Sequence, residues 1–144
     1  MIDLSRLLPR LKLVSSNTTR TNLEIASAQT RDTENKDVAV LKSLDLTKEL
    51  GQRLERCILG GNLDEVGRIF HAHWLNKKRR SSLISSAQLN SIYERALTNG
   101  ATGGKLVGLG GGGYFLFYVP KKLTGFETVP FSIDWEGCKV IYFS

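Results

Sequence analysis

The sequence predicts an α+β domain in which helices pack on one face of a mostly antiparallel, ferredoxin-like sheet. Two observations predict it: the first two thirds of the chain repeat apolar side chains at helical spacing, and the last third is rich in glycine and β-forming residues. At 144 residues the chain is long enough to bury a core of its own. We therefore expect residues 1–144 to form a single domain.

The longest helix is predicted between Asp37 and Leu59, after which Gly60-Gly61 supply a stop. The apolar residues that mark its buried face are Leu46, Leu50, Leu54, Cys57 and Ile58. Their spacing is typical of an amphipathic helix.

Two shorter helices should follow, each with a capping-box pattern at its start. Asn62 with Glu65 begins the first of them, and Ser85 with Gln88 begins the second. Gly100 is expected to end the second helix, because glycine readily adopts the left-handed backbone conformation that follows a helix C-terminus.

Short segments with the composition of strands complete the predicted domain. They are Leu11–Ser16, Leu106–Val107, Tyr114–Val119, Val129–Ile133 and Cys138–Tyr142. The last two flank Glu136-Gly137 and alternate in side-chain type, which predicts a β-hairpin. Serine, asparagine and threonine residues after the first strand predict the start of a further helix.

The chain carries a formal net charge of +6, which favours anionic partners such as phosphorylated metabolites, nucleotides or nucleic acid. Much of this positive charge lies in the run Lys77–Arg80, which either forms the solvent-exposed end of a helix or contacts a phosphate group. Cys57 and Cys138 lie far apart in apolar segments and are expected to behave as small hydrophobic residues. Because no apolar stretch reaches about 20 residues, we expect a cytoplasmic protein with no membrane partner.

The strongest local signal is the segment 103–113, which reads GGKLVGLGGGG between a predicted helix and a strand. Glycine permits positive φ angles and close approach of a ligand, and successive free N–H groups can bind an anion. The segment lacks the lysine followed by serine or threonine of a Walker-type phosphate loop, and it does not open a helix as a dinucleotide-binding loop does. It is therefore either a flexible turn or an anion site of another kind.

An apolar strand follows the pattern Lys105-x-x-Gly108-x-Gly110-Gly111-Gly112-Gly113, and together they resemble the third conserved motif of the galactokinase, homoserine kinase, mevalonate kinase and phosphomevalonate kinase (GHMP) family. The segment from His71 to Ser82, followed by Ile84-Ser85, is similar to the branch that phosphorylates D-glycero-D-manno-heptose 7-phosphate and related sugars. The resemblance covers roughly Leu11 to Ser144 and is most specific from Leu63 to Pro120.

The resemblance implies the C-terminal domain of a sugar kinase that transfers the γ-phosphoryl group of ATP to a sugar hydroxyl. In this family the phosphate loop, the metal site and the catalytic carboxylate lie in the N-terminal domain, and no such motif occurs in this sequence. We therefore expect no catalytic residue here and no tight binding of ATP or Mg²⁺ to this chain alone. The expected partners are the sugar phosphate and either an N-terminal kinase domain or a second copy of the chain.

The resemblance and the charge pattern together assign substrate or phosphate binding to a set of glycines and bases. They are Lys105, Gly108, Gly110, Gly111, Gly112, Gly113, Lys77, Lys78, Arg79 and Arg20. The sequence departs from the family at Leu109, where a small residue is usual, and a leucine there either crowds the cleft or points into the core. Arg80 and Leu83 stand where the branch more often has leucine and glycine.

Two other functional classes compete with the kinase. Gly113–Val119 superficially resembles the central strand of an RNA-recognition sheet, but no basic residue precedes it and the bulky Phe115 occupies a position that should be small. The run is apolar throughout, which predicts a buried strand and argues against nucleic acid as a partner. The other class is a non-catalytic module that oligomerises through an exposed apolar face. A metal site of His71 and His73 is not expected, because residues two apart do not share a helical face.

Overall fold

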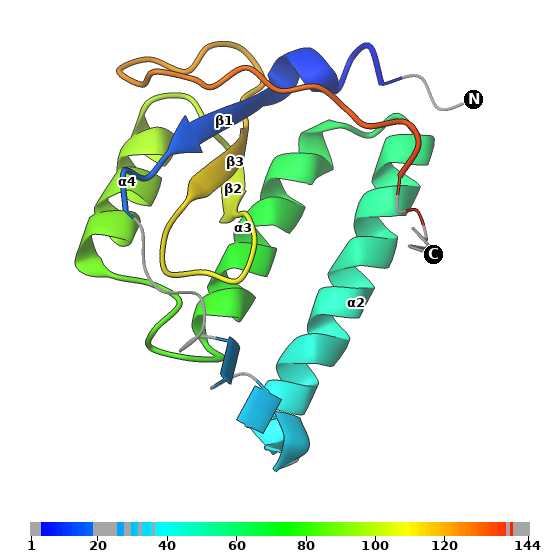
Figure 1. Ribbon diagram of the computed structural model, residues 1–144. Helices are drawn as coiled ribbons and strands as arrows, with labels where there is room; N and C mark the ends of the chain where they lie inside the picture. The colour runs from blue at the N-terminus through cyan, green and yellow to red at the C-terminus, as the bar shows by residue number, and fades with distance from the viewer. Residues whose placement is uncertain are drawn as a thin grey trace, which may run out of the picture.

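The computed structural model describes residues 4–18, 26–27, 30–31, 33–35, 37–137 and 139. The elements of this part follow in the order η1 (Leu8–Arg10), β1 (Leu11–Ser15), α2 (Val38–Leu59), α3 (Asp64–Lys78), α4 (Ala87–Thr98), β2 (Gly103–Leu106) and β3 (Tyr114–Tyr118). Figure 1 shows a small sheet beside α4 and α3, with α2 as the outermost helix. The predicted α+β class is confirmed. Within these ranges, no helix is long and apolar enough to cross a membrane.

The three strands form one antiparallel sheet in the order β1-β3-β2. Leu106 of β2 lies opposite Phe115 of β3, which fixes the register of this pair. Phe115 and Phe117 point to the same face, where they contact Trp74 of α3 and Tyr93 of α4. These four aromatic side chains are at most 1% exposed, so they form the centre of the core.

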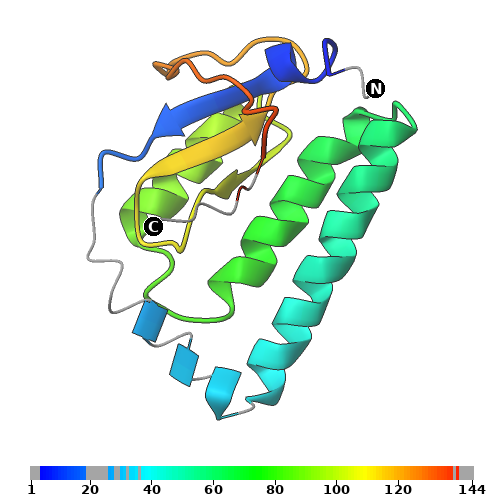
Figure 2. The same ribbon diagram turned by 45° about the vertical axis from the view of Figure 1, so that its right-hand side comes forward.

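Two glycines allow α3 to approach β2 closely. A Cβ atom on Gly103 would lie 1.8 Å from the carbonyl oxygen of Gly67, and one on Gly67 would lie 2.0 Å from Thr102 Oγ1. Both distances are far below van der Waals contact, so a side chain at either position would push the helix and the strand apart. Helix α2 packs on the side of α3 that faces away from the sheet (Figure 2).

The helix starts differ in part from the predicted ones. Helix α2 begins at the predicted place, where the carboxylate of Asp37 caps it by accepting hydrogen bonds from two N–H groups of the first turn. The capping box predicted at Asn62 is wrong: its N–H still donates to a carbonyl of α2, and Leu63 is the N-cap of α3 without a side-chain bond. The cap predicted at Ser85 is wrong by one residue, since Ser86 Oγ accepts the N–H that closes the first turn of α4.

The hairpin predicted near the C-terminus is wrong for its first arm. Val129 forms one isolated bridge with Leu13 of β1, and residues 130–137 contain no strand. The ring of Pro130 fixes φ at about −65°, far from the value of about −140° in an antiparallel strand, which disfavours continuation of the ladder beyond that bridge. Of the second arm only Lys139 is described, and the helix start predicted after β1 falls largely on residues 19–25, which lie outside the described residues.

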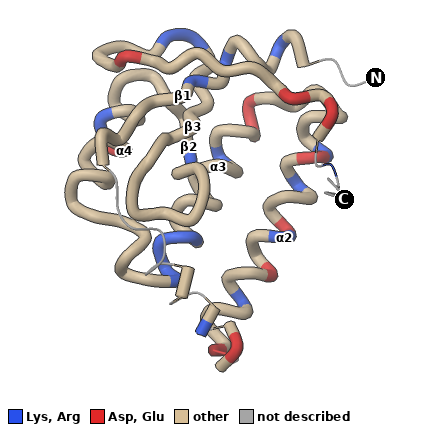
Figure 3. The backbone as a smooth tube through the Cα atoms, viewed as in Figure 1, with Lys and Arg blue, Asp and Glu red and all other residues tan. Residues whose placement is uncertain are grey.

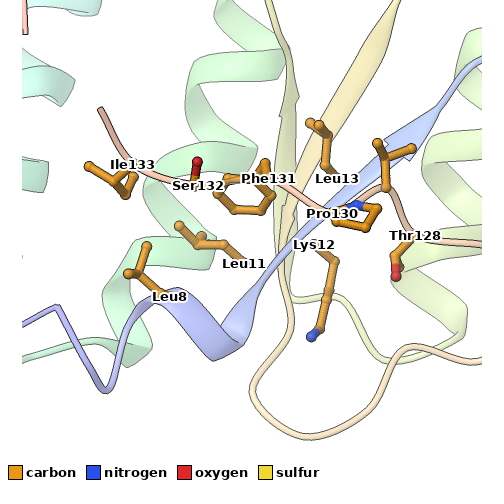
Figure 4. A pocket seen from close by; sticks show the side chains of 10 residues that line it. Leu8, Leu11, Lys12, Leu13, Thr128, Pro130, Phe131, Ser132 and Ile133 are labelled. Atoms are coloured by element: carbon orange, nitrogen blue, oxygen red, sulfur yellow. The ribbon is translucent and has the colours of Figure 1, made fainter. Parts of the chain in front are cut away.

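The segment after Val129 nevertheless stays beside β1. It lines a pocket of about 240 Å³ with the strand, and Figure 4 shows the side chains of Phe131 and Leu11 close together there. The Lys12 ammonium points away from this apolar group. Apolar contact thus holds the segment along the edge of the sheet without a hydrogen-bonded ladder.

Candidate functional site

The glycine loop, residues 107–113, connects β2 to β3. The N–H of Val107 donates to the carbonyl of Tyr114 at 2.9 Å, and the N–H groups of Gly111 and Gly113 donate to carbonyls of neighbouring segments. The loop N–H groups that have no hydrogen-bond partner within the described ranges are those of Gly108, Leu109, Gly110 and Gly112. Free backbone N–H groups bind anions, so the loop has unused capacity for a negatively charged ligand.

Backbone conformation explains the glycines of this loop. The φ angle is positive at Gly108, Gly110, Gly111, Gly112 and Gly113. Gly108, with φ of +78°, has open space around it, whereas a Cβ atom on Gly112 would lie 2.2 Å from the carbonyl oxygen of Thr18. Gly108 is thus required by its φ angle alone, and Gly112 by the close approach of the chain at Thr18. Together with the hydrogen bonds, they give the loop a defined conformation.

Lys77 connects α3 to the glycine loop. Although it belongs to a basic run, it is only 6% exposed. Its ammonium donates to the carbonyl of Leu106 at 3.2 Å and to the carbonyl of Gly108. Burial, followed by the positive charges of Lys105 and Arg80, lowers the pKa of Lys77 to about 8. Its side chain therefore remains largely charged near pH 7 and holds the start of the loop.

Arg80 connects the end of α3 to α2. Its Nε donates to Ser43 Oγ at 2.9 Å, and a terminal nitrogen donates to Thr47 Oγ1. Buried Asn76 supports the same contact, because its Nδ2 donates to the Ser43 carbonyl at 2.8 Å and to the Thr47 hydroxyl at 3.1 Å. Neutral oxygens thus fix the guanidinium in place without neutralising its charge, and burial lowers its pKa.

A pocket of about 280 Å³ lies between these groups and the glycine loop. It is lined by His73, Lys77, Arg80, Lys105 and residues 106–109, and we name it the cationic pocket. The Lys105 ammonium makes no hydrogen bond or ion pair with any described residue, and burial lowers its pKa. Figure 3 shows basic residues gathered at the C-terminal end of α3 and a further one on β2.

The two histidines of α3 have different surroundings. His73 lines the cationic pocket, where burial, followed by the charge of Lys105, lowers its pKa to about 4 and keeps it neutral near pH 7. His71 Nδ1 lies 2.8 Å from the hydroxyl of Tyr93, whose oxygen also accepts the N–H of Gly104. Among the residues described, no group of histidine, cysteine and acidic side chains is arranged to hold a metal ion.

Other predicted site residues lie elsewhere. Lys78 stands over the ring of Trp74, 5.3 Å from its centroid, and donates to Asn90 Oδ1 at 3.2 Å. It therefore covers the aromatic core and does not line the cationic pocket. Arg79 is exposed and also lies outside the pocket lining. Arg20 lies outside the described residues.

Two departures from the family pattern meet at the pocket. Leu109 is 40% exposed and lines it, so this side chain borders the pocket and does not point into the core. Arg80 lines it as well, and the sequence reasoning did not assign Arg80 or His73 to the site. A signal was present in the sequence, because positions 73, 77 and 80 recur at helical spacing, which favours one common side for two residues of α3 and for Arg80 just after its end.

Known proteins resemble the chain in sequence and in fold. It is 29% identical over 83 residues to the D-glycero-alpha-D-manno-heptose 7-phosphate kinase of Campylobacter jejuni, a match that covers 58% of this chain and 24% of that protein. The solved structure of L. major mevalonate kinase in complex with R-mevalonate is similar in fold, with a TM-score of 0.70 and 20% identity. This match covers 77% of this chain and 33% of the mevalonate kinase chain. No family model matches. The chain thus spans a third or less of either relative, and the resemblance predicted from its motifs is confirmed: it is a domain similar to the C-terminal domain of the GHMP kinases.

Proposed function

We propose that the chain is the substrate-side, C-terminal domain of an ATP-dependent kinase that phosphorylates a hydroxyl of a heptose-phosphate-like sugar. The observation that carries the proposal is the glycine loop, in which Gly108 and Leu109, whose N–H groups have no partner among the described residues, line a pocket together with three basic side chains. Phosphoryl transfer depends on positioning and on stabilising negative charge, which such groups provide. The similarity to a heptose 7-phosphate kinase supports the class of sugar.

In this proposal the loop and the bases have separate roles. The N–H groups of Gly108 and Leu109, which have no partner among the described residues, bind oxygens of a phosphoryl group, and Lys77 keeps the loop in position through its bonds to two carbonyls. ATP supplies the phosphoryl group, and its Mg²⁺ neutralises charge on the nucleotide phosphates. The lining of the cationic pocket does not fit a Mg²⁺ site, since it contains three basic side chains and no carboxylate. We therefore assign ATP and Mg²⁺ to a nucleotide-binding kinase domain as partner, and we propose a cytoplasmic location for both.

The RNA-binding alternative finds little support in the sheet. Phe115 and Phe117 are fully buried, so neither ring can stack on a base, and Tyr114 is the aromatic residue of β3 that reaches solvent. Self-association has a specific observation in its favour. Val38 and Leu59 of α2 are 65% and 60% exposed, and covering them would remove apolar surface from water. A second copy of the chain is therefore the alternative partner.

Thermal unfolding of the purified chain tests the proposal, with D-glycero-D-manno-heptose 7-phosphate and Mg·ATP added separately and together. We expect the sugar phosphate to raise the Tm with concentration and Mg·ATP alone to leave it unchanged. Gly108→Ala disfavours the φ angle of the loop without a steric clash and should weaken the response. Gly61→Ala, which has a φ angle of +72° and equally open surroundings, is the matched control and should respond as the wild type does.

A wild-type chain whose Tm responds to neither ligand contradicts the proposal. A response to Mg·ATP alone would also contradict it, because the nucleotide would then bind to this domain without its proposed partner.

A further inference from the structure

The cationic pocket brings three positive side chains together without a counter-ion. Lys77, Arg80 and Lys105 all line it, and none of them forms an ion pair with a described residue. The ion pairs of the described part are formed elsewhere, by Glu65 and Glu136. Like charges held together in a partly buried site destabilise the fold, so their clustering points to a negatively charged ligand.

Helix α2 borders this region and offers neutral groups there. Ser43 is buried and Thr47 is half-buried on the side that meets α3, whereas Asp45 and Glu49 are exposed. The guanidinium of Arg80 is therefore fixed by hydroxyl groups, in a place where a carboxylate would have cancelled its charge. The arrangement positions a cation and leaves its charge available.

Each of the three bases also has hydrogen-bond donors to spare. A guanidinium has five N–H groups, and two of the nitrogens of Arg80 are used by α2. The ammonium of Lys77 bonds two carbonyls with its three N–H groups, and the ammonium of Lys105 bonds no described residue. The remaining donors can form charge-assisted hydrogen bonds with a ligand that carries several oxygen acceptors.

We propose that the cationic pocket binds a phosphate dianion, which is either the phosphate group that a sugar substrate already carries or free inorganic phosphate. Only the first of these sources rests on the proposed function, because the charge and the donors of the pocket do not depend on it. A phosphate dianion is compact and accepts hydrogen bonds from several sides, which matches donors that reach the pocket from α3 and β2.

Titration calorimetry of the chain with inorganic phosphate, glucose 6-phosphate and glucose tests the proposal. We expect both phosphates to bind and glucose not to bind. Arg80→Gln and Lys105→Gln should each weaken binding by about tenfold or more, because each removes a charge-assisted hydrogen bond. Arg79→Gln removes the same charge from the neighbouring exposed position and should bind as the wild type does.

The ranking of the two anions identifies the source of the phosphate. Tighter binding of glucose 6-phosphate assigns the pocket to a phosphate carried by a sugar, and tighter binding of inorganic phosphate assigns it to the free ion. Absence of binding by both anions overturns the proposal, as does equal binding by the wild type, Arg80→Gln and Lys105→Gln.

A stability measurement separates ligand binding from a purely structural role. Without phosphate, Lys105→Gln should be at least as stable as the wild type, because it removes repulsion from the other two bases. Lower stability of this variant together with unchanged anion binding would assign Lys105 to the fold and overturn the proposal. If heptose 7-phosphate binds equally to the wild type and to Arg80→Gln, the kinase proposal is retained and the phosphate pocket is rejected.

Discussion

The two faces of the sheet at β2 and β3 differ in what lies beside their apolar side chains. On one face Phe115 and Phe117 pack with aromatic rings of α3 and α4, and they are fully buried. On the other face Tyr118 and Leu116 belong to a second apolar cluster that includes side chains of α3, and Lys105, opposite Leu116 in the register, borders a pocket lined by three basic side chains. Both faces stabilise the fold through apolar burial, but only the second also holds clustered positive charge, at a cost in stability. The comparison indicates that the cationic pocket depends on apolar packing around it.

Helix α3 connects the two faces. Trp74 points into the aromatic core, while Lys77, three positions later, reaches the glycine loop. Because one rigid helix carries both side chains, packing at the first helps to fix the geometry of the second. Substitutions on the two faces should therefore change the free energy of unfolding by different amounts and, in part, in opposite directions.

The largest effect is expected from the aromatic face. Phe115→Ala should lower the free energy of unfolding by about 3–5 kcal/mol, because it leaves a cavity among rings that are fully buried. Urea denaturation measures this loss. Tyr114→Ala changes the neighbouring residue, which is 45% exposed, and should have a much smaller effect. Equal losses in the two variants would show that the aromatic face does not dominate stability.

A smaller effect is expected where α3 meets β2. Gly103→Ala should cost about 1–3 kcal/mol, because the new methyl group would lie 1.8 Å from the Gly67 carbonyl oxygen and force the helix away from the strand. Gly51→Ala is the control within α2, where nothing lies within 4 Å of the added Cβ atom. It should stabilise the protein by about 0.5–1 kcal/mol, since alanine favours a helix more than glycine does. A stable Gly103→Ala variant would contradict the close packing described here.

The charges of the cationic pocket should make the free energy of unfolding depend on pH. The pKa of Lys77 is lowered from 10.5 to about 8 in the folded protein, so the unfolded chain binds more protons between these values. Stability therefore rises with pH in this window, by roughly 1–3 kcal/mol, and the penalty is fully present below pH 8.

Urea midpoints measured from pH 7 to pH 10 test this expectation. Lys105→Gln removes one of the charges that lower the pKa of Lys77, so it should flatten the rise. Above this range burial of Tyr93, which raises the pKa of its hydroxyl, acts in the opposite direction. Stability that is constant or falls between pH 8 and pH 10 would mean that Lys77 is not held in this environment.

The smallest effect concerns the helix that covers the aromatic face. Ser86→Ala should cost about 1 kcal/mol, because Ser86 Oγ accepts the N–H of Leu89 at 3.2 Å and caps α4. Ser85→Ala should cost less, since Ser85 bonds the Asn90 side chain and does not cap the helix. Thermal unfolding of the two variants measures the difference, and a larger loss for Ser85→Ala would restore the cap predicted from the sequence.

Local patterns determined most of the secondary structure. Apolar spacing placed the three helices, and β-forming residues placed β1 and β3, because these features depend on neighbours within one or two turns. The caps of α3 and α4 and the C-terminal hairpin were predicted incorrectly, since adjacent polar residues offer equivalent caps and a strand needs a partner that only the fold supplies.

The sequence by itself determined the glycine loop, the presence of Lys105 and Lys77 beside it, and the resemblance to the GHMP kinases, because these are carried by residue types in a fixed order. Only the tertiary structure decided which bases share a pocket. It buried Lys77, turned Lys78 over Trp74, and brought Arg80 to the hydroxyl groups of α2. The physical reason is that the environment of a charge depends on groups distant in sequence, and a basic run read locally has the composition of a solvated helix end.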